Sequence, residues 1–452
     1  MRATVLLLLF SLACSARAVT TPVHFGLFGN VHTAIPAGEV RRNIVLISDN
    51  EGWSTRDEAL ASALADDGAL VFGIDLPAYL KQMESIEDKC SLPASHFEEM
   101  THWMQREQKL DKFIYPLLVG DGAGATFAYA VDAQAPAGTY AGLITLGWDA
   151  TLRLPKPVCK GDAGKMTAPD NAGAFRVVPV AKLANPWLPQ PFAPGARLFG
   201  VLNQLPQRAK SWATPASKDP AAELVESVRW LTTHAESAPP LPSDVADLPL
   251  VEVPAQGEFS QRVAIILTGD GGWAGLDIAI ADQLSKRGID VVGLNTLKFF
   301  WQTRKPGEAA DALTRIIGHY GAQHPQADFV VLGYSFGAAL APVVINRVPD
   351  AARARIAAQV LISPDPEAVF EIHVGDWFGS TQHEGALPIL PEIAKTKVPV
   401  ICVHGDEEDD SFCKALIGRA NVRELVLRGG HHYNGDYDKL GAGIAGSLPA
   451  RK

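Results

Sequence analysis

The sequence predicts two α/β domains in tandem, because a strand–helix–strand pattern occurs twice and a stretch rich in Pro, Ala and Ser separates the two copies. Each copy opens with an apolar run of strand length that ends in a Gly/Asp turn, which is typical of a buried strand in a parallel sheet. The predicted elements are strands 43–47 and 69–74 around a helix at 58–66, and strands 263–267 and 290–294 around a helix at 277–286.

The two copies match again further along the chain, where residues 115–124 parallel residues 329–337. Internal similarity of this kind indicates two domains of similar plan. We therefore expect a first domain at 19–236, a linker at 237–254 and a second domain at 255–452.

The composition describes a globular protein, with 47% hydrophobic and 20% charged residues among 452. The formal net charge is −10, and no run of Lys or Arg offsets it. This balance argues against a nucleic-acid partner.

The N-terminus has the pattern of a secretory signal peptide. Arg2 precedes an apolar core at 5–12, and Ala16-Arg17-Ala18 forms a small-x-small cleavage site. The apolar core is shorter than the ~20 residues that span a bilayer. We expect residues 1–18 to be removed on export to the periplasm, with a lipid anchor at Cys14 as the alternative.

Four cysteines remain after such cleavage, and an even number in an exported protein permits two disulfides. Cys402 and Cys413 flank a short acidic loop, so we predict that they pair. Cys90 and Cys159 then pair by elimination.

A nucleophile motif lies in the second copy. Gly333-Tyr334-Ser335-Phe336-Gly337 fits the G-x-S-x-G elbow, in which a strand turns sharply into a helix and exposes the serine oxygen at the helix N-terminus. An apolar strand precedes the motif, and residues 338–344 can continue as a helix. This context predicts an α/β-hydrolase fold with Ser335 as the nucleophile.

An acid and a histidine should follow the serine in that order. A strand at 398–405 opens into the acidic run 406–410, where we predict Asp410 as the acid, with Asp409 and Asp406 as alternatives. A last strand at 424–427 leads into a Gly-Gly-His-His-Tyr loop. We predict His432 as the general base because an aromatic residue follows it, and His431 is the alternative.

The oxyanion hole of such a site combines two backbone N–H groups. One should come from Phe336 and the other from Gly271 or Gly272 in the loop after strand 263–267. Asp270, Trp273 and Tyr334, which adjoin these groups, are predicted to bind the substrate. The scheme requires no metal and no organic cofactor.

The first copy lacks the nucleophile, because Gly122 stands where the second copy has Ser335. No Gly-Gly-His loop follows it either. We expect a degenerate hydrolase-like domain without chemistry of its own.

The second copy resembles the VirJ/AcvB family of bacterial virulence proteins. The resemblance rests on the Gly-Asp-Gly-Gly-Trp loop at 269–273, the Leu-Lys-Phe-Phe-Trp segment at 297–301 with Arg304 and Pro306, the serine elbow and the Gly-Gly-His-His ending. The first half resembles the additional domain of the AcvB-like members. The resemblance implies a periplasmic enzyme that hydrolyses the aminoacyl ester of lysyl- or alanyl-phosphatidylglycerol at the membrane surface.

Two other interpretations remain open on the sequence. The same resemblance implies association with type IV secretion, so the chain could be a non-catalytic adaptor for secretion-machinery proteins. A general periplasmic esterase or thioesterase would use the same triad.

Overall fold

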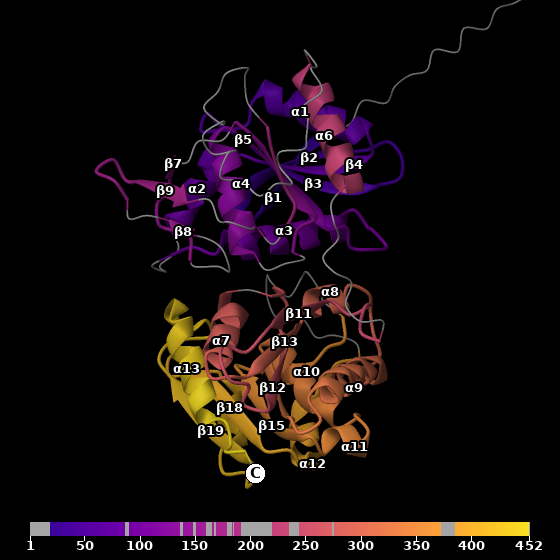
Figure 1. Ribbon diagram of the computed structural model, residues 1–452, viewed down its shortest axis with the longest axis vertical. Coiled ribbons are helices and arrows are strands. Elements are labelled where there is room, and N and C mark those ends of the chain that lie inside the picture. The colour runs from indigo at the N-terminus through magenta and orange to yellow at the C-terminus, as the bar shows by residue number, and fades with distance from the viewer. Residues whose placement is uncertain are drawn as a thin grey trace, which may run out of the picture.

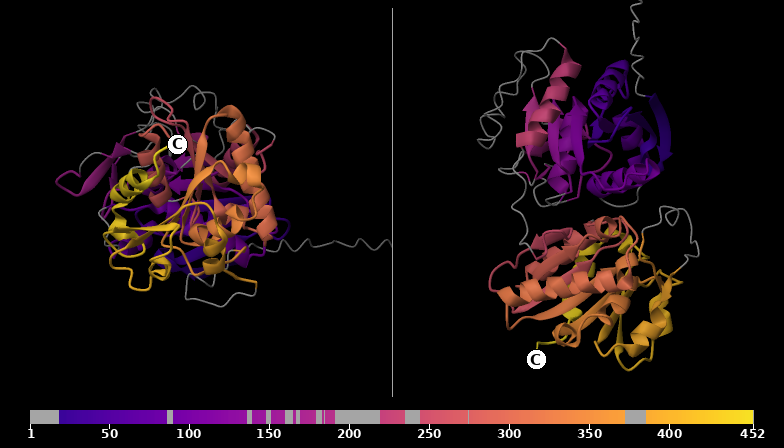
Figure 2. Two further views of the ribbon diagram at one scale, coloured as in Figure 1. Left: turned by 90° about the horizontal axis from the view of Figure 1, so that it is seen from below. Right: turned by 90° about the vertical axis from the view of Figure 1, so that its right-hand side faces the viewer.

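The computed structural model describes residues 19–85, 90–135, 139–147, 151–159, 165–166, 169–178, 183, 185–190, 219–234, 244–273, 275–371 and 385–451. Two α/β bodies lie end to end along the long axis of the molecule, the first in indigo to magenta and the second in orange to yellow (Figures 1 and 2). The predicted fold class of two α/β domains is therefore confirmed. The predicted signal peptide lies outside the described residues.

The first domain is built on a seven-stranded sheet with the order β1-β2-β4-β3-β5-β6-β10. The pairs β1–β2 and β2–β4 are antiparallel, and the remaining pairs are parallel. Its strands are β1 (Val19–Phe25), β2 (Gly29–Ile35), β3 (Arg42–Ile47), β4 (Ala69–Ile74), β5 (Pro116–Asp121), β6 (Gly142–Leu146) and β10 (Trp187–Gln190). A small antiparallel sheet joins β7 (Thr151–Arg153), β9 (Ala174–Val178) and β8 (Lys165–Met166).

Helices cover both faces of this sheet, as a parallel sheet requires. Apolar side chains of α1 and α6 form one core with one face of the sheet, and those of α2, α3 and α4 form another core with the opposite face. The helices are α1 (Thr55–Asp66), α2 (Leu76–Met83), α3 (Pro93–Glu107), α4 (Ala123–Gln134) and α6 (Pro220–His234), with a 3-10 turn η1 (Gly26–Phe28).

The second domain repeats this plan with the order β11-β13-β12-β14-β15-β18-β19, in which only β11 is antiparallel. Its strands are β11 (Leu250–Val253), β12 (Arg262–Leu267), β13 (Asp290–Leu294), β14 (Asp328–Tyr334), β15 (Ile356–Ile362), β18 (Val400–Gly405) and β19 (Val422–Leu427). A short ribbon pairs β16 (Glu367–Ala368) with β17 (Leu387–Pro388).

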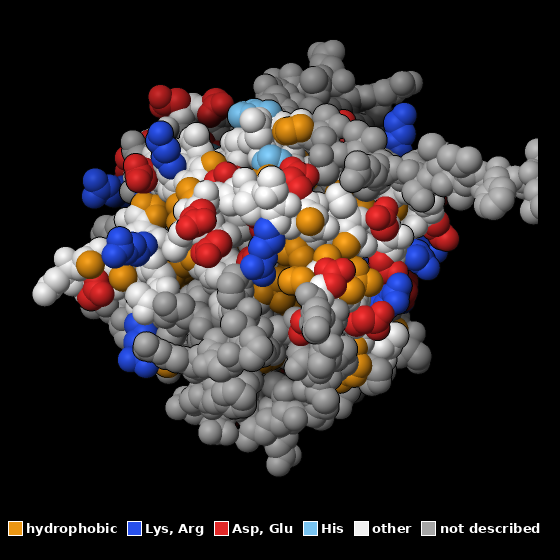
Figure 3. Space-filling view, turned by 90° about the horizontal axis from the view of Figure 1, so that it is seen from above, with side chains coloured by type: hydrophobic (Ala, Val, Ile, Leu, Met, Phe, Trp, Pro, Cys, Tyr) orange, Lys and Arg blue, Asp and Glu red, His pale blue; other side chains and the backbone are white. Residues whose placement is uncertain are grey.

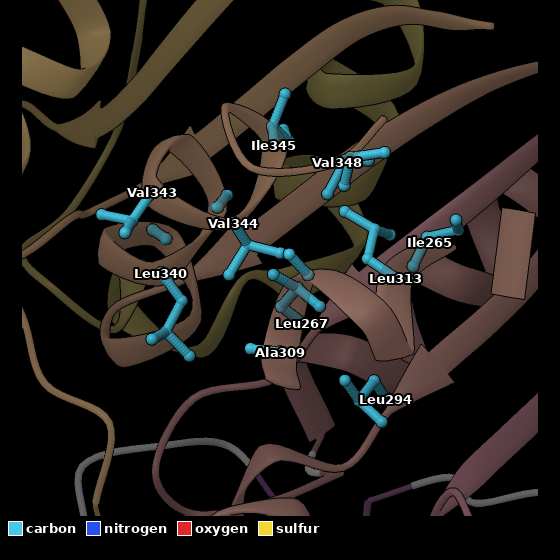
Figure 4. Close-up of a cluster of buried hydrophobic side chains, with 14 of the residues drawn as sticks. Ile265, Leu267, Leu294, Ala309, Leu313, Leu340, Val343, Val344, Ile345 and Val348 are labelled. Atoms are coloured by element: carbon cyan, nitrogen blue, oxygen red, sulfur yellow. The ribbon is translucent and has the colours of Figure 1, made fainter. Parts of the chain in front are cut away.

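Helices α7 and α13 lie together on one face of the second sheet, and α9 and α10 cover the other (Figure 1). Figure 4 shows how apolar side chains of α9 and α10 pack onto β12 and β13. The helices are α7 (Gly275–Ser285), α8 (Thr296–Phe299), α9 (Pro306–Gln323), α10 (Phe336–Ile345), α11 (Asp350–Arg353), α12 (Ile389–Lys395) and α13 (Tyr437–Ser447), with 3-10 turns η4 (Phe412–Leu416) and η5 (Tyr433–Gly435).

The second domain begins earlier than the sequence predicts. Val245 and Leu248 are buried in its core, and β11 pairs with β13 along the sheet edge. Residues 244–254, which were expected to belong to the linker, are therefore part of this domain. Their apolar residues are interspersed with Pro, Ala and Asp, so the composition of this stretch is typical of a linker although it contains a short edge strand.

Equivalent Trp–Gly pairs confirm the internal repeat. The ring of Trp53 occupies the space where Gly73 lacks a side chain, and the ring of Trp273 occupies the same space at Gly293. A Cβ at Gly293 would lie 1.9 Å from Cζ3 of Trp273, so only glycine leaves room for the ring.

Both predicted disulfides are confirmed: Cys402 pairs with Cys413, and Cys90 pairs with Cys159. Within the described part of the chain, no helix has the length and hydropathy needed to cross a membrane. Charges of both signs are interspersed on the described part of the face that the first domain turns away from the second (Figure 3).

Candidate active site

Ser335 occupies a strained turn between β14 and α10. Its backbone has φ 48° and ψ −113°, a conformation that L residues rarely adopt and that costs about 1–3 kcal/mol. A Cβ at Gly337 would lie 2.2 Å from the carbonyl oxygen of Leu267, and a Cβ at Gly333 would lie 2.3 Å from that of Gly337. The two glycines therefore let the strand and helix approach closely enough to hold the serine at the turn.

His431 faces this serine. Its Nε2 lies 3.2 Å from Oγ of Ser335, and its Nδ1 lies 2.9 Å from Oε1 of Glu408. The loop that carries His431 follows β19, and the loop that carries Glu408 follows β18. The three side chains form a continuous hydrogen-bonded series of nucleophile, imidazole and carboxylate.

The structure places the predicted base, His432, away from the serine. His432 is exposed, and its Nδ1 lies 2.9 Å from the hydroxyl of Tyr334. The next residue, Tyr433, is buried and its hydroxyl lies 2.8 Å from Oγ of Ser363. Burial of Tyr433 anchors the loop with the ring of His431 toward Ser335, so the alternative histidine has the catalytic geometry.

The structure likewise brings Glu408, and not Asp410, to the histidine. Glu408 is only 9% exposed, whereas Asp410 and Asp409 are exposed. The other alternative, Asp406, accepts a hydrogen bond from the N–H of Gly429 and so braces the histidine loop.

Glu408 was not among the residues predicted from the sequence, because only the aspartates of the run 406–410 were candidates for the acid. Glutamate also serves as the triad acid in this fold, so the two glutamates of the run could have been predicted as candidates as well. The second carboxylate oxygen of Glu408, Oε2, accepts hydrogen bonds from Oγ of Ser363 at 2.9 Å and from the N–H of Gly405 at 3.3 Å.

The electrostatics of the pair favour the charged carboxylate beside the imidazole. Burial lowers the pKa of His431, but the hydrogen bond and charge of Glu408, with the charges of Asp365 and Asp270, raise it above 6.5 overall. Burial raises the pKa of Glu408, but its hydrogen bonds from His431, Ser363 and Gly405 lower it below its usual value overall. A protonated imidazole is therefore stabilised when it forms.

The expected oxyanion donors lie on two elements. Phe336 is the first residue of α10, where helix N–H groups have no carbonyl partner within the helix. The N–H of Gly272 donates to the carbonyl oxygen of Gly269 at 3.2 Å, so that donor is already used. A Cβ at Gly271 would border open space, and Gly271 stays the candidate of the two predicted loop donors.

The three residues predicted to bind the substrate have different surroundings in the structure. Trp273 is 3% exposed and packs in the core over Gly293, so it is placed to support the loop and not to touch a substrate. Tyr334 holds the histidine loop, since its hydroxyl also lies 3.3 Å from the carbonyl oxygen of His431. Asp270 is partly exposed on the glycine loop, and its charge acts on His431.

The equivalent turn of the first domain is closed by a carboxylate. Gly122 has φ 55° and ψ −115°, almost the angles of Ser335, which identifies the same elbow. Oδ1 of Asp49 accepts a hydrogen bond from the N–H of Ala123 at 2.8 Å, the group that corresponds to the N–H of Phe336. A side chain at Gly122 would begin 2.3 Å from Cγ of Asp49. The carboxylate thus occupies the position of an oxyanion.

A family model and a curated protein each match part of this chain. Residues 261–452 match the family model described as bacterial virulence protein (VirJ). A cutinase of Pyricularia oryzae is 34% identical over 101 residues, which are 22% of this chain and 40% of the cutinase. The chain thus spans well under two thirds of that relative.

Solved α/β structures match about half of the chain. An α/β serine hydrolase homologue from Coxiella burnetii has 16% identity and a TM-score of 0.32, covering 44% of this chain and 91% of its own. An α/β serine hydrolase without a lid from Xanthomonas campestris also has 16% identity and a TM-score of 0.32, covering 48% and 100%.

Proposed function

Because residues 261–452 match the family model of the bacterial virulence protein VirJ, we propose that the chain is a serine hydrolase of aminoacyl-phosphatidylglycerol. The observation that carries the proposal is the series Ser335 Oγ, His431 and Glu408, joined at 3.2 and 2.9 Å. An arrangement of this kind activates a serine for attack on an ester carbonyl.

In the proposed reaction, Nε2 of His431 takes the proton of Ser335 as Oγ attacks the aminoacyl carbonyl. The N–H groups of Phe336 and Gly271 stabilise the oxyanion. His431 then returns the proton to the glycerol oxygen, and the lipid leaves with a free hydroxyl. A water molecule, deprotonated by the same ring, cleaves the acyl-enzyme and releases the amino acid.

The charges around the site suit such a substrate. The free α-amino group of the aminoacyl ester is cationic, and Asp270 and Asp365 both lie close enough to act on His431. Anionic side chains near a reacting centre attract a cationic group. We propose that Asp270 contributes to binding this ammonium group.

We also propose a periplasmic location, reached through cleavage after Ala18. Two disulfides are compatible with an oxidising compartment. Under this proposal the protein works at the membrane surface on a lipid head group, and secretion-machinery proteins are the alternative partners.

The proposal is tested with a lipid panel. Purified protein should release the amino acid from lysyl- or alanyl-phosphatidylglycerol, and Ser335→Ala should abolish release, since loss of the nucleophile costs about 10⁶-fold in kcat in a comparable triad. The side chain is small and partly exposed, so we expect an unchanged melting curve. Turnover by well-folded Ser335→Ala protein would contradict the proposal.

The match to a cutinase favours a second candidate, a general esterase. The same panel separates the two functions. A general esterase would cleave simple soluble esters and leave the aminoacyl lipids intact. A non-catalytic adaptor would cleave neither and would not react with a fluorophosphonate probe.

A further inference from the structure

One short segment lies behind both proposed oxyanion donors. This segment, Thr296–Trp301, comprises α8 and the two aromatic residues after it. The hydroxyl of Thr296 donates to the carbonyl oxygen of Gly269 at 2.7 Å, at the base of the glycine loop. The ring of Phe300 meets the ring of Phe336 edge to face, with centroids 5.5 Å apart. The position of this segment therefore influences both donors.

The first domain holds the beginning of this segment. Oε1 of Glu98, on α3, lies 3.3 Å from Nζ of Lys298 and 3.3 Å from Nδ2 of Asn295. The side chains of Glu98 and Lys298 are 3% and 9% exposed, so the contact is a buried ion pair between the domains. Asn295 caps α8 through the N–H of Lys298, and its side-chain amide lies beside Gly272 of the oxyanion loop.

The same helix holds the end of the segment. Arg106, two turns further along α3, donates from its guanidinium to the carbonyl oxygens of Phe300, at 3.1 Å, and Trp301. The guanidinium also lies over the indole of Trp301, 4.9 Å from the ring centroid. Both ends of Thr296–Trp301 are thus tied to α3 by charged side chains.

The Glu98–Lys298 pair is deeply buried, and a buried ion pair has strong geometric preferences. A charge in a low-dielectric interface must keep its partner, because desolvation penalises it when it is alone. Burial raises the pKa of Glu98, and Lys298 and Asn295 oppose that effect. The contacts therefore hold α8 at a defined position relative to α3.

We infer that the catalytically degenerate first domain positions the oxyanion hole of the second, with Glu98 and Arg106 acting as positioning residues through Thr296–Trp301. The inference rests on the proposed serine hydrolase chemistry. It assigns the first domain a role in transition-state stabilisation, although neither residue touches the reacting atoms.

The test compares full-length variants on a small soluble p-nitrophenyl ester. Glu98→Ala and Arg106→Met should each lower kcat about 10- to 100-fold with little change in KM, because a displaced oxyanion donor weakens transition-state binding. Glu98→Gln should recover part of the loss, since its amide can still bond to Asn295 and Lys298. Glu107→Ala, an exposed position on the same helix, is the matched control and should retain the wild-type kcat.

A second variant separates positioning from stability. Glu98→Leu with Lys298→Met removes both buried charges, so it should melt close to the wild type and still turn over slowly. Recovery of the wild-type kcat in this pair, or wild-type kcat in Glu98→Ala, would overturn the inference. Ser335-dependent labelling of the wild type by a fluorophosphonate probe reports on the triad itself. Its absence would overturn the proposed hydrolase and, with it, this inference.

Discussion

At the scale of single residues, burial decides which of several similar side chains takes part in the site. Five consecutive acidic residues follow β18, and only Glu408 turns inward, where Ser363 and Gly405 donate to it. Two consecutive histidines follow β19, and His431 takes the position beside Ser335 because Tyr433 is anchored in the core. The chemistry thus depends on which side chain points toward Ser335, and two adjacent residues cannot both point there.

The two histidines should differ sharply in their effect on rate. His431→Ala removes the base that contacts Ser335, and we expect a loss of at least ~10³-fold in kcat. His432→Ala removes only a contact with Tyr334, so kcat should fall by less than about tenfold. Steady-state kinetics on a soluble ester measure both variants. A dead His432→Ala with an active His431→Ala would show that the base is the other residue.

The acid sets the pH dependence. His431 must be neutral to accept the serine proton, and its pKa is raised above 6.5 chiefly by Glu408 against the effect of burial. We expect kcat/KM to be full at high pH and to fall as the pH drops through a value above 6.5. Glu408→Gln removes the raising charge, so the fall should move to lower pH and the plateau should drop about 10³- to 10⁴-fold.

Asp410→Asn is the control for this measurement. Asp410 is exposed and its loss leaves the Glu408–His431 contact in place, so the pH profile should match the wild type. A shifted profile in Asp410→Asn with an unchanged one in Glu408→Gln would contradict the assignment of the acid.

At the scale of elements, the site depends on the loops that follow successive parallel strands. The carboxyl ends of β12, β14, β18 and β19 lie at one edge of the sheet, and each leads into a loop or turn that carries part of the site. Parallel pairing places these loops together although up to 160 residues separate them in sequence, as Gly271 and His431 illustrate.

The disulfide Cys402–Cys413 should stabilise the loop that carries Glu408, since it closes a separation of 11 residues around it. Replacing both cysteines by Ala should lower the free energy of unfolding by about 2–3 kcal/mol. We also expect a lower kcat, because Glu408 loses a fixed loop. Cys90→Ala with Cys159→Ala is the comparison, and it should lower stability with a smaller effect on kcat. Equal kcat losses in both pairs would argue against the loop effect.

At the scale of the whole molecule, the two domains share one fold but differ at the position of the nucleophile. The sheets share the order of their central strands, and the elbow angles of Gly122 and Ser335 nearly coincide. In the first domain Asp49 occupies the oxyanion position, and in the second domain the corresponding residue is Gly269, which has no side chain to fill it. The first domain keeps the fold and, by our inference, supports the chemistry of its neighbour.

A fluorophosphonate probe should therefore label one serine in the chain, Ser335. Restoring a serine by Gly122→Ser should not create a second labelled site, because its Cβ would lie 2.3 Å from the carboxylate carbon of Asp49 and the N–H of Ala123 is engaged. Peptide mapping after labelling measures this. Labelled peptides from residues 19–236 would contradict an inert first domain.

The sequence by itself determined the features that are local along the chain. Buried strands, the glycine-flanked serine turn and the duplicated pattern follow from hydrophobic periodicity and from the backbone freedom of glycine. The strands at 69–74 and 290–294 have the predicted bounds, and both disulfides pair as predicted. Spacing and residue type carry this information without knowledge of distant contacts.

Only the tertiary structure decided which acid and which histidine lie beside Ser335 and which residues of the first domain contact the second. Glu408 is selected by Ser363, 45 residues earlier, and Lys298 meets Glu98 across 200 positions. Such contacts depend on how strands and domains pack, and adjacent loop residues of similar chemistry give no local sign of which one points inward. The free energy that distinguishes them comes from burial and hydrogen bonding in the folded chain.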